Sequence, residues 1–250
     1  MPRRENIRLP FAWRPPVEHT VELATPATYF HANRGVMASF LPADYARVLE
    51  VGCAAGGFST HLTRPCEIWG IEPNGQAAEL ARSRLHKVLR GFYSDVAAEL
   101  PDNYFDLVIC NDVIEHMPDH DQFLEEIRTK MKPSGCIVGS IPNIRHVTAL
   151  FKLLVARDFP YANSGILDRT HLRFFTQKSL LRAFRQHGYI VEDMRGIGSV
   201  IVHGLSRPDN PLAPWKNTLF KLASASVVLL TLGFYWDTQF PQFGFRVRTR

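Results

Sequence analysis

Two acidic residues with a glycine-rich turn between them are the residues of this chain whose spacing most directly indicates chemistry. Glu50 lies in a short apolar run, and Gly52 and Gly56 lie in the turn that follows it. A second apolar run, over residues 68–71, ends at Glu72. In α/β proteins, a strand, a glycine-rich turn, a helix and a second strand ending in a carboxylate form the half-site for an adenosine-type cofactor. We therefore expect the backbone of the turn to approach a nucleoside whose ribose hydroxyls are bound by the carboxylate.

The elements that must position this site alternate along the chain. We expect strands over residues 46–51, 66–71, 87–90, 105–110, 136–141, 189–195 and 242–248, the last near an edge of the sheet. We expect helices over 28–40, from about 58, over 75–85, over 120–131, over 146–156, and from Thr176 to Gly188. Asn74, Asp119 and Thr176 are predicted N-caps. Alternation of this kind is typical of a doubly wound, mostly parallel α/β sheet.

The predicted organisation is one domain with an N-terminal arm. Residues 1–26 contain five prolines and are expected to be irregular. Residues 27–250 are expected to form a single domain, with insertions on the acceptor side at about 143–175 and 197–240. Within the second insertion, residues 222–236 are uncharged over 15 positions, which is shorter than the roughly 20 needed to span a bilayer. We expect a buried helix there.

Composition limits the classes of partner. The net charge of +5 is mild, and the basic residues are not interleaved with aromatic ones, so nucleic-acid binding is not expected. The four cysteines form no CxxC pair, and the N-terminus has no apolar signal region, so a cytoplasmic protein with reduced thiols is expected. Lys216 and Lys221 precede the uncharged segment, which leaves peripheral membrane contact open. The oligomeric state is left open.

Four segments in order resemble the motifs of class I S-adenosylmethionine-dependent methyltransferases. These segments are residues 48–56, residues 71–73, residues 105–116 and residues 124–135, and the resemblance covers about 45–141. It implies a Rossmann-like, doubly wound, seven-stranded sheet, mostly parallel with an antiparallel last strand. It also implies S-adenosyl-L-methionine as the cofactor and methyl transfer as the reaction.

The resemblance carries cofactor contacts onto particular residues. Glu50 would lie near the cofactor's amino group, Glu72 would take the ribose hydroxyls, and Asp95 would accept from the adenine amino group. The full expected set is Glu50, Gly52, Ala54, Gly56, Glu72, Pro73, Asp95, Val96, Asn111, Asp112 and Val113. Ala54 stands where the family usually has a second glycine. A methyl group there is tolerated at negative φ and is a steric problem at positive φ.

Residues 140–143 and 165–176 resemble a narrower group of bacterial methyltransferases associated with glycan biosynthesis. A hydroxyl acceptor favours a general base with a pKa near neutrality, and histidine suits that role. His171 is the first candidate, with Asp168 to orient it, and His146 is the second; a purely structural role stays open for both. His116 is expected to be structural. No spacing typical of metal ligands is present, so no metal is expected.

Three functions remain open at this stage. The first is O-methylation of a hydroxyl on a sugar or another small molecule. The second keeps the fold but changes the acceptor to a quinone-like lipid precursor at a membrane surface. The third is a module that binds S-adenosylmethionine without catalysis. A nicotinamide-dependent dehydrogenase would need a GxGxxG pattern, and the glycines at 52, 56 and 57 do not match that spacing.

Overall fold

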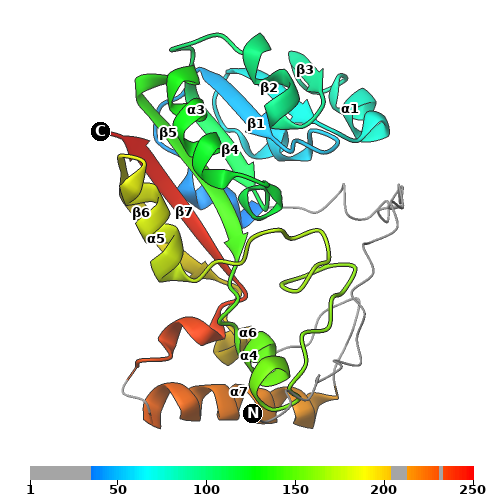
Figure 1. Ribbon diagram of the computed structural model, residues 1–250, viewed down its shortest axis with the longest axis vertical. Coiled ribbons are helices and arrows are strands. Elements are labelled where there is room, and N and C mark those ends of the chain that lie inside the picture. The colour runs from blue at the N-terminus through cyan, green and yellow to red at the C-terminus, as the bar shows by residue number, and fades with distance from the viewer. Residues whose placement is uncertain (1–34, 204–212, 231–232) are drawn as a thin grey trace, which may run out of the picture.

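A seven-stranded mixed sheet organises the molecule. The computed structural model describes residues 35–203, 213–230 and 233–250. The strand order is β3-β2-β1-β4-β5-β7-β6, and β7 runs antiparallel to both of its neighbours (Figure 1). The strands are β1 (Arg47–Val51), β2 (Glu67–Glu72), β3 (Lys87–Arg90), β4 (Phe105–Asn111), β5 (Met131–Pro142), β6 (Tyr189–Ile197) and β7 (Gln242–Thr249). This order confirms the predicted fold class.

The helices connect these strands in the predicted sequence. The α-helices are α1 (Gly75–Ala81), α2 (Tyr93–Val96), α3 (His120–Lys130), α4 (Val147–Leu154), α5 (Gln177–Gln186), α6 (Val200–His203) and α7 (Pro214–Leu230). The 3-10 helices are η2 (Gly35–Phe40), η3 (Gly57–His61), η4 (Ala97–Glu99), η5 (Ile114–His116) and η6 (Trp236–Gln239). Asn74, Asp119 and Thr176 each accept a bond from a backbone N–H in the first turn, so the three predicted N-caps are confirmed.

The core lies on both faces of the sheet. Neighbouring residues of a strand point to opposite faces, so Leu49 and Val48 of β1 enter different clusters. The cluster around Leu49 includes buried residues of α2, α3 and α5. The cluster around Val48 includes buried residues of η2, η3 and α1. A register shift between Phe105 and Leu107 places these two β4 residues on opposite faces although their numbers differ by two.

Two predicted helices differ from those observed. The helix expected from about 58 is the five-residue 3-10 helix η3, in which Phe58 is the buried residue, because a single apolar anchor does not support further α-helical turns. The helix expected over 75–85 ends at Ala81. Alanines take its inward positions, and Leu80 is 54% exposed.

The apolar segment near the C-terminus also differs from its prediction. The helix expected to be buried is α7, and Leu222, Leu229 and Leu230 on it are exposed. In α4, Phe151 and Leu154 are exposed as well, although their spacing is typical of a buried helical face. The predicted arm over 1–26, and the part of the 28–40 helix before residue 35, lie outside the described residues.

Strand direction decides which elements meet the site. The carboxyl ends of β1, β2, β4 and β5 lie at one edge of the sheet. Strand β6 ends at this edge and β7 begins there, so α6, α7 and η6 connect two strands at the same edge. Figure 1 shows α4, α6 and α7 together beyond the carboxyl end of β5.

Candidate active site

The turn after β1 has the backbone that its glycines predicted. Gly52 and Gly56 have φ of 70° and 72°, in the left-handed region that favours glycine. The N–H of Gly52 donates to the carbonyl of Ile71 at 2.8 Å, which ties the turn to β2. A Cβ on Gly52 would lie 2.8 Å from Cγ2 of Val113. Glycine is therefore needed at position 52 both for the conformation and for the close approach of the segment after β4.

Ala54 adopts the conformation that makes its methyl group unfavourable. Its φ is 47°, in the left-handed region, where a Cβ is strained by about 1 kcal/mol. The N–H of Ala54 donates to Oε2 of Glu72 at 2.8 Å, and this bond supports the strained residue. The departure from the family pattern therefore lies at a position where the backbone requires a positive φ.

Glu72 and Glu50 form a buried acidic pair at this edge. Their exposed fractions are 5% and 6%. Oε1 of Glu72 accepts from the N–H of Asn74 and Oε2 from Ala54, each at 2.8 Å. Burial raises the pKa of Glu50 to about 8, and the charge of Glu72 adds to the rise. Burial also raises the pKa of Glu72, although its two backbone hydrogen bonds oppose the rise. Two buried acidic residues with raised pKa values, placed together in this way, mark a candidate functional site.

The last residue of β4 adds an amide, and the residue after it adds a strained aspartate. The side-chain nitrogen and oxygen of Asn111 are buried and have no hydrogen-bond partner among the described residues. Asp112 has a φ of 54°, and its Oδ1 accepts from Ser140 Oγ at 2.7 Å and from Gln242 Nε2 at 2.9 Å. Sequence reasoning missed Gln242, because only the sheet topology brings the start of β7 to this edge.

Three further residues were predicted to contact the cofactor. Asp95 is exposed, and its Oδ2 accepts from the N–H of Phe92 at 3.1 Å, so it caps α2. The side chain of Val96 is buried in the core cluster around Leu49. Pro73 is exposed directly after Glu72. In this structure the Asp95 carboxylate thus serves as a helix cap.

His171 is buried and oriented by a backbone carbonyl. Its Nδ1 lies 3.1 Å from the carbonyl oxygen of Ile166, and because a carbonyl only accepts, Nδ1 donates and Nε2 is left as the acceptor. Burial and the neighbouring His116 lower the pKa of His171. The carboxylate of Asp168 instead accepts from the N–H and the hydroxyl of Thr170, so the expectation that Asp168 orients the ring is corrected.

His171 belongs to a group that the sequence did not reveal. Ligand atoms of Glu115, His116 and His171 lie within 4.8 Å of one another, and groups of this kind can hold a metal ion. Nδ1 of His116 lies 3.1 Å from the carbonyl oxygen of Thr170. The rings of His116 and His171 are therefore both oriented by a backbone carbonyl at Nδ1. His146, the second predicted base, is buried at the N-cap of α4 with Nδ1 2.8 Å from Thr148 Oγ1. It lies outside the group of three.

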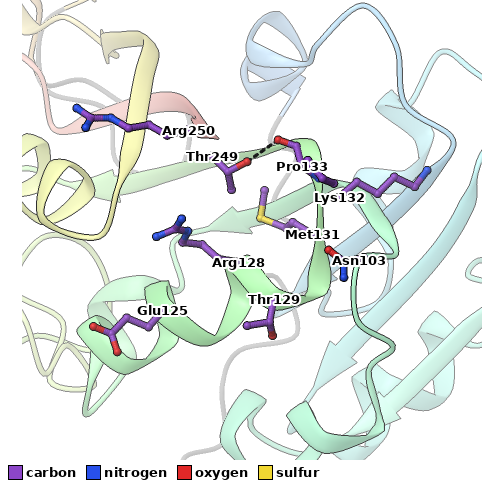
Figure 2. Close-up of a pocket in the computed structure, with 9 residues that line it drawn as sticks. All are labelled: Asn103, Glu125, Arg128, Thr129, Met131, Lys132, Pro133, Thr249 and Arg250. Carbon is purple, nitrogen blue, oxygen red and sulfur yellow. Dashed lines mark hydrogen bonds between the residues drawn. The ribbon is translucent and has the colours of Figure 1, made fainter.

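A hollow of about 420 Å³ lies at the opposite edge of the sheet. Figure 2 shows it between the end of α3 and the C-terminal end of β7, where the hydroxyl of Thr249 donates to the carbonyl of Pro133 at 2.7 Å. Its lining includes Arg128, Lys132 and Arg250, and none of the residues predicted to bind the cofactor. This hollow is therefore separate from the candidate active site.

The residues at the carboxyl edge fit S-adenosylmethionine. The close approach at Gly52 leaves no room for a side chain, and the buried acids Glu50 and Glu72 belong to the same edge. Neither polar atom of the Asn111 amide has a partner in the part of the chain that the structure describes. A cofactor that carries ribose hydroxyls and positive charge supplies partners for these groups.

Comparison with known proteins defines the family. The family model of a methyltransferase domain matches residues 26–193. The ubiquinone biosynthesis O-methyltransferase of Aeromonas salmonicida is 29% identical over 160 residues, which are 60% of this chain and 66% of that protein. The protein of the same name from Paraburkholderia phymatum is 30% identical over 163 residues, which are 60% of this chain and 67% of that protein. The chain thus spans about two thirds of the length of these relatives.

Solved structures agree on the fold. A SAM-dependent methyltransferase from Archaeoglobus fulgidus superposes with a TM-score of 0.59 at 17% identity, over 88% of this chain and 96% of that one. The [4+2]-cyclase SpnF superposes with a TM-score of 0.53 at 16% identity, over 86% and 78% of the two chains. Because a cyclase shares the fold, the fold alone does not define the reaction.

The chain belongs to the methyltransferase domain family. S-adenosylmethionine held at this edge would supply an activated methyl group through its sulfonium. The residues of this chain have the tasks of binding the nucleoside, placing the acceptor in line and excluding water.

Proposed function

We propose that this enzyme methylates a hydroxyl oxygen of a small-molecule acceptor and that His171 accepts the proton. The observation that carries the proposal is the ring orientation, with Nδ1 bonded to the Ile166 carbonyl and Nε2 left as the acceptor. A base must be neutral to accept a proton, and the lowered pKa of His171 keeps it neutral at physiological pH. Glu50, Gly52, Glu72 and Asn111 bind the cofactor in this proposal.

The acidity of the acceptor favours a phenolic hydroxyl. A phenol of the tyrosine type has a pKa of about 10, whereas a sugar hydroxyl is far less acidic. Proton transfer to a histidine of lowered pKa therefore costs less from a phenol. The relatives named ubiquinone biosynthesis O-methyltransferase support a quinone-like acceptor for this chain as well. We favour a phenolic, quinone-like lipid precursor over a sugar.

A glycan hydroxyl is the second candidate acceptor. Residues 140–143 and 165–176 favour it through their resemblance to glycan-associated methyltransferases. The test is formation of S-adenosylhomocysteine by the purified chain with a panel of prenylated catechols and phenols beside a panel of monosaccharides and oligosaccharides. Turnover with the phenols alone supports the proposal. Turnover with sugars alone would show that the acceptor is a sugar and not a phenol. No turnover with any acceptor would support a module that binds the cofactor without catalysis.

An experiment can distinguish the role of His171 as a proton acceptor from a role as a metal ligand. Glu115, His116 and His171 could hold a divalent ion that lowers the pKa of an acceptor hydroxyl. We propose that catalysis needs no metal, and we expect turnover to persist after dialysis against EDTA. Loss of turnover that returns on addition of Mg²⁺ or Zn²⁺ would assign these three residues to a metal instead.

A further inference from the structure

Helix α7 exposes most of its large apolar side chains, which a helix of a globular domain normally buries. Its exposed side carries Trp215, Leu219, Leu222, Leu229 and Leu230, with Ser226 between them. Its covered side carries Asn217, Lys221, Ser224, Ala225 and Val228. Leu229 and Leu230 are 77% and 82% exposed, whereas Ser224 is buried.

This orientation leaves large apolar side chains in water. In globular proteins the apolar stripe of a helix faces the core. Contiguous exposed apolar surface of this kind marks a site of protein or membrane contact. The helix therefore has a surface that needs an apolar environment outside the described fold.

Neighbouring segments extend the surface. After α7, Phe234 is 85% exposed and Trp236 is also exposed. At the same end of the molecule lies α4 (Figure 1). It exposes Phe151 and Leu154, and Val155 directly after it is exposed as well. We name the exposed apolar residues of α4, α7 and 234–236 the apolar end surface.

We propose that the apolar end surface docks on an anionic lipid bilayer, with α7 lying in the plane of the interface. Residues 213–236 contain Lys216 and Lys221 and no acidic residue, and α4 contains Lys152 and no acidic residue. Basic side chains beside an apolar face favour anionic headgroups. Trp215, Tyr235 and Trp236 are the amphipathic aromatics that collect at the headgroup level of membranes.

The dimensions favour a helix that lies on the bilayer. The 17 residues of α7 extend over about 25 Å, which is short of the hydrocarbon thickness of about 30 Å. Among the described residues, no helix combines the length and the hydropathy needed to cross a membrane. The interface is then the location that solvates both the leucines and the lysines.

The apolar end surface lies beyond the same edge of the sheet as the candidate active site. The chain leaves the carboxyl edge at Ile197, runs through α6, α7 and η6, and returns to that edge at Gln242. Arg145 bonds to Asp237 through Nε at 2.6 Å, which joins this connection to the segment after β5. Docking would therefore bring the acceptor side of the enzyme to the membrane. The inference goes beyond the proposed function, because it holds for a lipid acceptor and for a soluble one.

Vesicle flotation of the full chain tests this proposal. The probes are vesicles of phosphatidylcholine alone and of phosphatidylcholine mixed with phosphatidylglycerol. We expect flotation with the anionic vesicles and less with the neutral ones. Leu222→Glu combined with Leu229→Glu should reduce the partition coefficient more than tenfold, because each leucine loses an apolar environment worth about a tenfold factor. Leu80→Glu is the matched control, since Leu80 is exposed on α1, and it should float as the parent does.

Other outcomes would overturn the proposal. These are absence of flotation, flotation of the double variant at the parent level, or an equal loss in Leu80→Glu. Light scattering tests whether a second copy of this chain covers the surface in place of a membrane. A parent dimer that the double variant converts to a monomer, without parent binding to vesicles, would assign the apolar end surface to a second copy of this chain. Far-UV circular dichroism and cofactor binding report whether each variant is folded, independently of methyl transfer.

Discussion

The carboxylate of Glu72 accepts a hydrogen bond from the backbone N–H of Ala54 at a distance of 2.8 Å. This contact joins the end of β2 to the turn after β1. It holds Ala54 at a φ of 47°, which an alanine adopts at a cost. The binding carboxylate and the shape of the turn are therefore coupled, and changes at either residue should affect the other.

Ala54→Gly should stabilise the protein. Glycine relieves the left-handed strain but loses more backbone entropy on folding, so we expect a net gain of about 0.5–1 kcal/mol in the free energy of unfolding. Urea unfolding measures this gain. Ala55→Gly is the matched control, because Ala55 is buried and is not among the residues with positive φ. It should lose about 1–2 kcal/mol. Equal effects of the two substitutions would refute the strain at Ala54.

Protein stability should fall as pH rises through the neutral range. Glu50 has a pKa of about 8 in the folded protein, against 4.5 for an unperturbed carboxyl. Between these values the folded state holds a proton that the unfolded state has released, so the free energy of unfolding decreases with pH. Glu72 contributes to the same decrease in the free energy of unfolding, because its pKa is also raised. Glu50→Gln should flatten the dependence measured by urea unfolding from pH 5 to pH 8. A stability that rises over this range would contradict the raised pKa.

Asn111→Leu should separate folding from cofactor binding. The buried amide of Asn111 has no partner among the described residues, so an apolar side chain of similar size should leave the free energy of unfolding unchanged or raise it by about 1 kcal/mol. Affinity for S-adenosylmethionine should fall at least tenfold. Calorimetry and urea unfolding on the same preparation measure both quantities. An unchanged affinity would remove Asn111 from the binding site.

The base role of His171 predicts a specific kinetic loss. His171→Asn should reduce kcat on the true acceptor by about 10²–10⁴-fold while the affinity for S-adenosylmethionine is preserved. The lowered pKa of His171 places the acid limb of the parent's pH profile below about 6.5. His187→Asn is the control, since His187 caps α5 at the opposite edge of the sheet. Near-normal turnover of His171→Asn from pH 6 to pH 9 would exclude the base role.

The strands and caps could be predicted because local patterns determine them. The apolar run at 105–110 and the Asn74 cap depend on a few neighbouring residues, and both agree with the structure. The turn glycines and the two acids could be predicted for the same reason. Their motif lies within one strand–helix–strand unit.

Other features depend on contacts between distant segments. Gln242 meets Asp112 across 130 positions, and His171 joins Glu115 and His116 through tertiary packing. The ring of His171 is oriented by the carbonyl of Ile166, whose residue type does not indicate that role. Helix α7 was predicted to be buried because its composition is apolar, and composition does not reveal which side of a helix is covered.

Titration of the parent and of Glu72→Gln with S-adenosylmethionine in a calorimeter tests the central claim most directly. We expect saturable binding to the parent, no binding of NAD, and affinity at least tenfold weaker in Glu72→Gln. Glu67→Gln should bind as the parent does, because Glu67 lies at the other end of β2 and bonds to Trp69 and Tyr104. A folded Glu72→Gln protein with the affinity of the parent, or a parent that gives no heat with S-adenosylmethionine, would contradict the account.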